Sequence, residues 1–143
     1  MQTKFFQLLK VKMRRIDEIE GEILDAQNKK RETELKIKEI EVEVQELKVP
    51  KSGKFSQISI SSFFLTNLSN QKSFLKQELS SLKLRIEGLN TLYKEANIEY
   101  EKVKYLDDLE KQRYIKELKI KENKDMDEVG NLLFAKKNLR VNV

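Results

Sequence analysis

The chain has 143 residues, of which 37% are charged and 38% hydrophobic, with only 4 Gly and 1 Pro. This mix excludes a thick globular core, and abundant Lys and Glu with a helical period is typical of coiled coils. Cys and His are both absent, which excludes disulfides, thiolate or imidazole metal ligands and imidazole general bases. The net charge of +5 is a small excess of 29 basic over 24 acidic residues, as on a solvated helical surface.

A first helix is expected over residues 3–48. Its apolar residues recur in alternating steps of three and four, which is the period of a coiled coil and not of a strand. Nine of the twelve seam positions are apolar, and the twelve are Leu9, Lys12, Ile16, Ile19, Ile23, Ala26, Lys30, Thr33, Ile37, Ile40, Val44 and Leu47. The weak layer of Lys30 and Thr33 allows two interpretations: the Lys extends to water, or it sets the register.

A loop is expected over residues 49–59. Pro50 cannot donate to a continuing helix, Gly53 suits a turn, and Ser52, Ser56 and Ser59 are natural helix N-caps. A loop of this length is too short to bring a second helix back in parallel, so the pattern predicts antiparallel pairing.

A second helix is expected over residues 60–139. Its seam is Leu68, Lys72, Leu75, Leu79, Leu82, Ile86, Leu89, Tyr93, Ala96, Tyr100 and Val103. Beyond Val103 a strict heptad would place Asp107 and Glu110 in the seam, whereas the apolar residues there are Leu106 and Leu109. This mismatch favours a stutter or a local change of the supercoil.

The expected fold is therefore all-α: a single domain, residues 1–143, forming an antiparallel coiled-coil hairpin whose second helix is the longer. Leu47 should lie level with about Ser62, and Phe5 with about Lys104. The last part of the second helix then has no partner in its own chain. Gly21 should lie near Gly88, which indicates either tolerated helical glycines or a close approach or bend of the helices.

No phosphate-binding loop occurs, and the Glu-rich runs fall on exposed helix faces, so we expect no catalysis, no cofactor and no small-molecule substrate. The apolar run within residues 1–12 is too short and too rich in Lys for a signal peptide or a membrane span, which favours a cytoplasmic protein. Two basic clusters are candidate docking sites for an acidic partner: Lys10, Lys12, Arg14 and Arg15, and Lys136, Lys137 and Arg140. Phe63 and Phe64 either close the end of the coil or serve as an exposed anchor for a partner.

Four features resemble the FliJ family of the flagellar type III export apparatus. The chain opens with Phe5-Phe6-Gln7-Leu8-Leu9 followed by a basic stretch, and it shares the family's length and two-helix layout. A Ser-containing loop precedes the second helix. The element Met126-Asp127-Glu128 near the C-terminus is similar to a family element, and a basic tail follows it.

The resemblance implies a non-enzymatic, rod-like stalk. Its terminal end would dock into the hexameric export ATPase through the two basic clusters. The middle and the loop end would contact the membrane export gate or export chaperones, with Phe63 and Phe64 as candidate contacts. The chain would be a monomer or weak homodimer beside the membrane-embedded apparatus. A self-associating structural coiled coil is the alternative, and a basic nucleic-acid-binding coiled coil is the lesser one.

Overall fold

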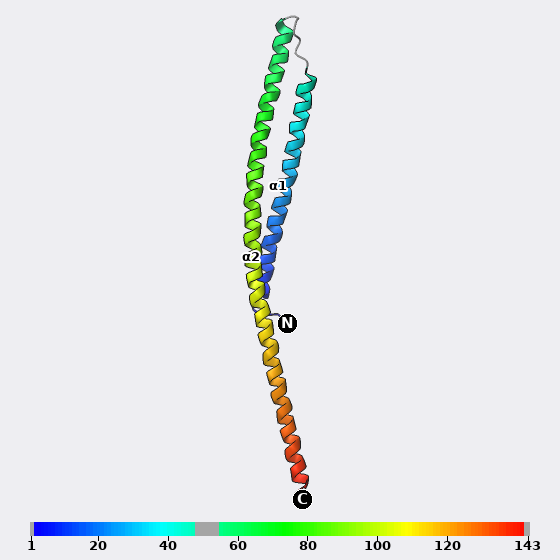
Figure 1. Ribbon diagram of the computed structural model, residues 1–143, viewed down its shortest axis with the longest axis vertical. Coiled ribbons are helices and arrows are strands. Elements are labelled where there is room, and N and C mark those ends of the chain that lie inside the picture. Colours follow the sequence, from blue (N-terminus) through cyan, green and yellow to red (C-terminus); the bar gives the residue numbers. More distant parts are fainter. Residues whose placement is uncertain (1, 48–54, 142–143) are drawn as a thin grey trace. The chain divides into compact units, whose positions relative to one another are not determined.

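The computed structural model describes residues 2–47 and 55–141. These residues form helix α1, Phe6–Glu46, and helix α2, Phe55–Val141, and contain no strand (Figure 1). The predicted all-α helical hairpin is confirmed, and α2 is the longer helix, with 87 residues against 41. Pro50, Gly53 and Ser52 lie outside the described residues.

The helix ends differ in detail from the predicted ranges. Thr3 caps α1, because its Oγ1 accepts a hydrogen bond from the backbone N of Phe5 and its carbonyl accepts one from Phe6, both at 3.2 Å. Helix α2 begins at Phe55 and not near residue 60. Ser56 and Ser59 therefore lie within the helix, and the prediction that they act as N-caps is wrong.

The chain divides into two compact units, residues 14–97 and residues 1–13 with 98–143. Within residues 14–97, α1 and α2 lie side by side and antiparallel (Figure 1). The Nζ of Lys72 lies 3.2 Å from Oε1 of Glu41, and the Tyr93 hydroxyl donates to Oε1 of Glu20 at 3.0 Å. This register agrees with the predicted one to about one helical turn.

The seam of this unit follows the heptad pattern closely. Every predicted seam position of both helices between residues 16 and 96 is buried or half-buried. Ile19 is the most enclosed large side chain, with 1% of its surface exposed. The hydroxyl of Thr33, which is 7% exposed, donates to the carbonyl of Lys29 at 2.8 Å, so a polar residue in the seam keeps a partner.

Gly21 and Gly88 are both exposed, and a Cβ built at either would meet no atom within 4 Å. Close approach of the helices at these glycines, one of the two interpretations of the sequence, is therefore wrong. These glycines therefore affect the stability of each helix through its backbone and not through packing between the helices.

In the other unit, the N-terminal residues pack on α2 at residues 98–111. Leu9 is half-buried, Val103 is 7% exposed, and the Nζ of Lys12 lies 3.8 Å from Oε2 of Glu99. The next seam position is Asp107, which is 4% exposed.

Asp107 shows that the predicted stutter is wrong. The hydroxyl of Thr3 donates to its carboxylate, and the Nζ of Lys111 lies 3.1 Å from Oδ2. These partners make a seam carboxylate tolerable, so the heptad continues and leaves Leu106 and Leu109 exposed at 45% and 44%. The hydrogen bond from Thr3 also holds the pKa of Asp107 below its ordinary value.

The last part of α2, residues 112–139, is called the C-terminal arm here. Each of its side chains is exposed, including the large apolar residues Met126, Leu132 and Phe134, which are 72%, 71% and 66% exposed. Nothing in the described part of the chain covers them. Neither helix has a stretch, among the described residues, long and apolar enough to cross a membrane.

Candidate partner-binding surfaces

The first predicted basic cluster is partly engaged within its own helices. The Nζ of Lys10 lies 4.6 Å from the centre of the Phe6 ring, and Lys12 pairs with Glu99. The guanidinium of Arg15 lies 3.8 Å from Glu18, while Arg14 is exposed. Such exposed contacts contribute about 1 kcal/mol or less each, so an acidic partner could replace them at little cost.

The second predicted cluster lies far along α2. Lys136 and Lys137 are exposed in the last turns of the helix, and the side chain of Arg140 lies outside the described residues. Because Lys12 pairs with Glu99, Lys136 is about 55 Å further along the helix at a rise of about 1.5 Å per residue. Lys12 and Lys136 are therefore well separated along α2, and whether the two clusters bind one partner stays a prediction.

The family-like element Met126-Asp127-Glu128 lies in the middle of the C-terminal arm. All three side chains are exposed, and none of them takes part in a hydrogen bond or ion pair found among the described residues. These residues have no packing role within the chain as described. They are available to a partner.

Phe63 and Phe64 stand edge to face, with ring centres 6.3 Å apart and planes at 71°. They are 69% and 52% exposed, so they do not close the end of the coil. Instead Ile58 and Ser61 occupy the partly buried side of this part of α2. Of the two interpretations, the exposed anchor agrees with this placement.

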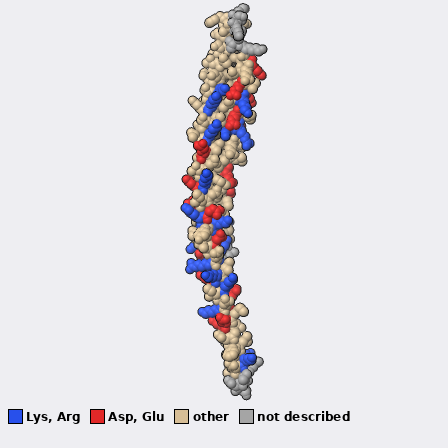
Figure 2. Space-filling model, in the orientation of Figure 1, with Lys and Arg blue, Asp and Glu red and all other residues tan. Residues whose placement is uncertain are grey.

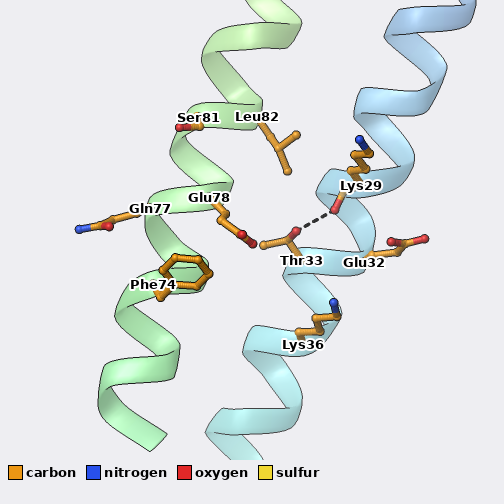
Figure 3. A pocket seen from close by; sticks show the side chains of 9 residues that line it. All are labelled: Lys29, Glu32, Thr33, Lys36, Phe74, Gln77, Glu78, Ser81 and Leu82. Atoms are coloured by element: carbon orange, nitrogen blue, oxygen red, sulfur yellow. Dashed lines mark hydrogen bonds between the residues drawn. The ribbon is translucent and has the colours of Figure 1, made fainter. Parts of the chain in front are cut away.

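A groove between α1 and α2 was not predicted. It has a volume of about 550 Å³. Its lining is Lys29, Glu32, Thr33, Lys36, Phe74, Gln77, Glu78, Ser81 and Leu82. Figure 3 shows Thr33 on α1 facing Glu78 and Leu82 on α2, with Phe74 on the same wall.

The groove exists because Thr33 is short. A larger residue at this seam position would fill the space between the helices. Phe74, which is 61% exposed, lines the groove without filling it. The signal in the sequence was the weak seam layer at Thr33 together with an aromatic residue one position before the seam residue Leu75. Volumes of this size accommodate one or two side chains of a partner.

In the described ranges no group of three or more His, Cys, Asp or Glu side chains is placed to hold a metal ion. The surfaces that the structure offers are exposed apolar residues, basic residues and one groove. Surfaces of this kind bind other macromolecules.

Comparison with known protein families decides the class. The model of a family described as the flagellar FliJ protein matches residues 1–139 of the chain. The chain belongs to the FliJ family. FliJ proteins are components of the flagellar export apparatus, and the family is structural and has no known enzymatic activity. No curated protein and no solved structure matches the chain.

Membership in the FliJ family agrees with the features described above. The match covers the C-terminal arm as well as the paired helices. The arm is therefore part of the FliJ pattern and not an extension peculiar to this chain. A role in flagellar protein export follows from the family, and the individual contacts are considered next.

Proposed function

We propose that this chain is a non-enzymatic stalk that docks into the ring of the hexameric export ATPase. The C-terminal arm is the observation that carries this proposal. It is a continuous helix whose apolar residues are exposed and whose last turns carry Lys136 and Lys137. A helix with this surface gains stability when another protein encloses it.

The N-terminal basic residues supply a second contact with the ATPase. Because Lys12 lies about 55 Å from Lys136 along α2, a partner that engages both clusters must extend along the helix. A channel through a ring can surround a helix along its length. Lys10, Lys12, Arg14 and Arg15 would then lie against the mouth of the channel, and the arm would lie within it.

The groove at Thr33 and Phe74 is the proposed contact for an export chaperone or for the cytoplasmic domain of the export gate. It supplies an apolar wall, and Lys29 and Lys36 flank it. Phe63 and Phe64 are the proposed contact on the side of the gate. In this role the chain works in the cytoplasm beside the membrane-embedded apparatus, and it takes no cofactor.

The ATPase contact is tested by capture of the purified hexameric ATPase on the immobilised chain. Truncation after Leu118 should abolish capture, and the double reversal Arg14→Glu with Arg15→Glu should weaken it several-fold, more so at low salt. The matched control is Leu24→Ser with Leu35→Ser, which removes two exposed apolar residues from α1 and should leave capture unchanged. Capture that survives both the truncation and the reversal would disprove docking.

Sedimentation separates this proposal from self-association. A stalk that acts as a monomer should sediment independently of concentration. A concentration-dependent dimer that disappears when Met126, Val129 and Leu133 become Ser would assign the arm to a second copy of the chain instead. The groove is tested separately by capture of an export chaperone or of the gate's cytoplasmic domain. Phe74→Ser should weaken that capture, whereas Leu84→Ser, which changes another exposed side chain of α2, should not.

A further inference from the structure

The large apolar residues of the C-terminal arm are gathered on one side of it. At about 100° per residue, eight of its ten large apolar residues fall within an arc of about 140°, and only Ile120 and Phe134 lie outside this arc. The arc is called the arm face here, and it includes Leu118, Val129 and Leu133. All ten residues are exposed. The arm is therefore an amphipathic helix and not an evenly apolar one.

The arm face continues the seam that α1 covers. Asp107, the last buried residue of α2 among those described, points about 30° from the centre of the arm face by the same count. Steps of three and four residues lead from Asp107 through Lys111 and Tyr114 to Leu118. Thr3 lies level with Asp107, and Tyr114 is about 10 Å further along α2. A helix that packs on the arm face would therefore lie end to end with α1.

The second half of the arm face is uncharged. No residue from Val129 to Ala135 is charged, and Lys136 and Lys137 follow. Figure 2 shows a largely tan surface in this part of the arm, next to basic side chains and to the grey residues at the end. A partner that packs here gains stability by bringing apolar side chains of its own.

The first half of the arm face carries two acidic residues, and its end carries a basic one. Glu122 and Asp125 lie within the arc, Lys136 lies near its centre, and Lys121 lies at its edge. None of the four takes part in an ion pair found in residues 2–47 and 55–141. The charged residues of the arm face are thus left for a partner to match.

Asp107 shows what a carboxylate on this side of α2 needs when another helix covers it. The hydroxyl of Thr3 donates to it, and the Nζ of Lys111 lies 3.1 Å from Oδ2. A partner that covers Asp125 has to supply a donor as well, and a basic side chain supplies the opposite charge with it. An acidic side chain fits opposite Lys136, which is about 17 Å further along α2.

A second copy of the arm does not meet this requirement. In a parallel pair of arms, Asp125 lies opposite Asp125 of the other copy, and Lys136 opposite Lys136. In an antiparallel pair the two faces, which run from Tyr114 to Leu139, overlap fully when the arms cross at about residue 126. Asp125 is one residue from that point, so its two copies meet again. Like charges face each other in both arrangements, which favours a partner of different sequence.

We propose that one helix of a partner protein packs along the arm face, end to end with α1. Its apolar side chains lie against Val129 and Leu133, a basic side chain lies opposite Asp125, and an acidic one opposite Lys136. The inference rests on the proposed function in one respect, since it takes this helix to belong to the export ATPase. The side of the arm that carries Lys116 and Asp127 stays in water, so the arm contacts one side of the channel and not its whole circumference.

Two charge reversals form the first test, with capture of the purified hexameric ATPase on the immobilised full chain. Asp125→Lys and Asp127→Lys change the charge equally at exposed positions two residues apart, but the two side chains point about 160° apart around the helix. Asp125→Lys should weaken capture at least about tenfold, whereas Asp127→Lys should change it by less than about twofold.

Two pairs of apolar residues form the second test. Val129→Ser with Leu133→Ser removes two large side chains from the arm face, and capture should fall at least about tenfold. Ile120→Ser with Phe134→Ser removes two from the opposite side, and capture should be unchanged. All four side chains are exposed, so circular dichroism should show the same helix content in both variants.

A third measurement maps the contact directly. The chain has no Cys, so Val129→Cys and Asn131→Cys each introduce a single thiol. The two positions point about 160° apart around the helix. In the complex with the ATPase, maleimide should modify the Val129→Cys chain at least about tenfold more slowly than in the free chain. The Asn131→Cys chain should react at the same rate in both.

The possible failures are distinguishable. Equal losses of capture within each matched pair, or protection of both thiols, would overturn the one-sided contact and leave ATPase docking in place. Capture that survives truncation after Leu118 would overturn the docking and this inference together. A concentration-dependent dimer that the Val129→Ser, Leu133→Ser chain no longer forms would place a second copy on the arm face, contrary to the charge argument.

Discussion

Replacing Gly21 and Gly88 with Ala should stabilise the hairpin. Both glycines lie in helix interiors, both are exposed, and the added methyl group would meet no atom within 4 Å. Gly is less favourable than Ala in a helix interior by about 0.8–1.0 kcal/mol, chiefly because its backbone loses more freedom on folding. Each substitution should therefore raise the free energy of unfolding by about 1 kcal/mol, and the pair by about 2 kcal/mol.

Urea unfolding followed by far-ultraviolet circular dichroism measures this change. With a denaturant slope of about 1–3 kcal/mol per molar, each substitution should raise the midpoint by about 0.3–1 M. Gly130→Ala is the matched control. It lies in the C-terminal arm, where a methyl group also meets nothing, but the seam does not depend on that helix segment. It should raise helix content without moving the midpoint.

A lower midpoint for Gly21→Ala or Gly88→Ala would refute this reasoning. Such a result would mean that the helices need a bend or a close approach at these positions that the exposed surface does not show. An unchanged midpoint for both would mean that helix propensity in these segments does not contribute to the cooperative transition.

Three further predictions concern stability. Ile19→Ala should lower the free energy of unfolding by about 2–4 kcal/mol, while Leu24→Ala, at 58% exposure, should change it by less than about 0.5 kcal/mol; equal urea midpoints would contradict the assigned seam. The pKa of Asp107 is lower in the folded chain than its ordinary value of 3.8, so ionised Asp107 stabilises the fold at pH values above 3.8. This stabilisation is lost as the pH falls through the lowered pKa. Thr3→Val should reduce that acid dependence in pH titrations of the unfolding midpoint, and an unaltered titration would exclude the hydroxyl as its cause. Leu133→Ser with Phe134→Ser should leave the urea midpoint unchanged, because both side chains are exposed. A lower midpoint would mean that the arm is buried in the free chain.

The paired part of the fold could be predicted because its signal is local. A heptad of Ile and Leu fixes which face of each helix is buried, and a short connection fixes the antiparallel direction. All seam positions predicted between Leu9 and Val103 are buried or half-buried. The register then follows to about one turn.

Asp107 could not be predicted in this way. Its place in the seam depends on the hydroxyl of Thr3, which is 104 residues away in the sequence, and on Lys111 one turn further. Considered by its own hydrophobicity, Asp107 indicated a break in the pattern. A long-range hydrogen bond reversed that interpretation.

The candidate sites likewise depended on contacts between the two helices. The exposure of Phe63 and Phe64 was one of two interpretations, and their position relative to the end of α1 was needed to choose between them. The groove at Thr33 depends on which α2 side chains face a short seam residue. Spacing within one helix does not determine this, because it needs the register to better than one turn.

The contact between Thr3 and Asp107 also has a consequence during synthesis. A ribosome adds about 5–20 residues each second, so Asp107 is made about 5–20 seconds after Thr3. Helix α1 is complete long before the residues that cover its seam exist. Pairing can begin only near the connection, where Glu41 meets Lys72, and then proceeds back toward the start of the chain. The nascent α1 therefore exposes its apolar stripe for several seconds, during which it is able to associate with other chains.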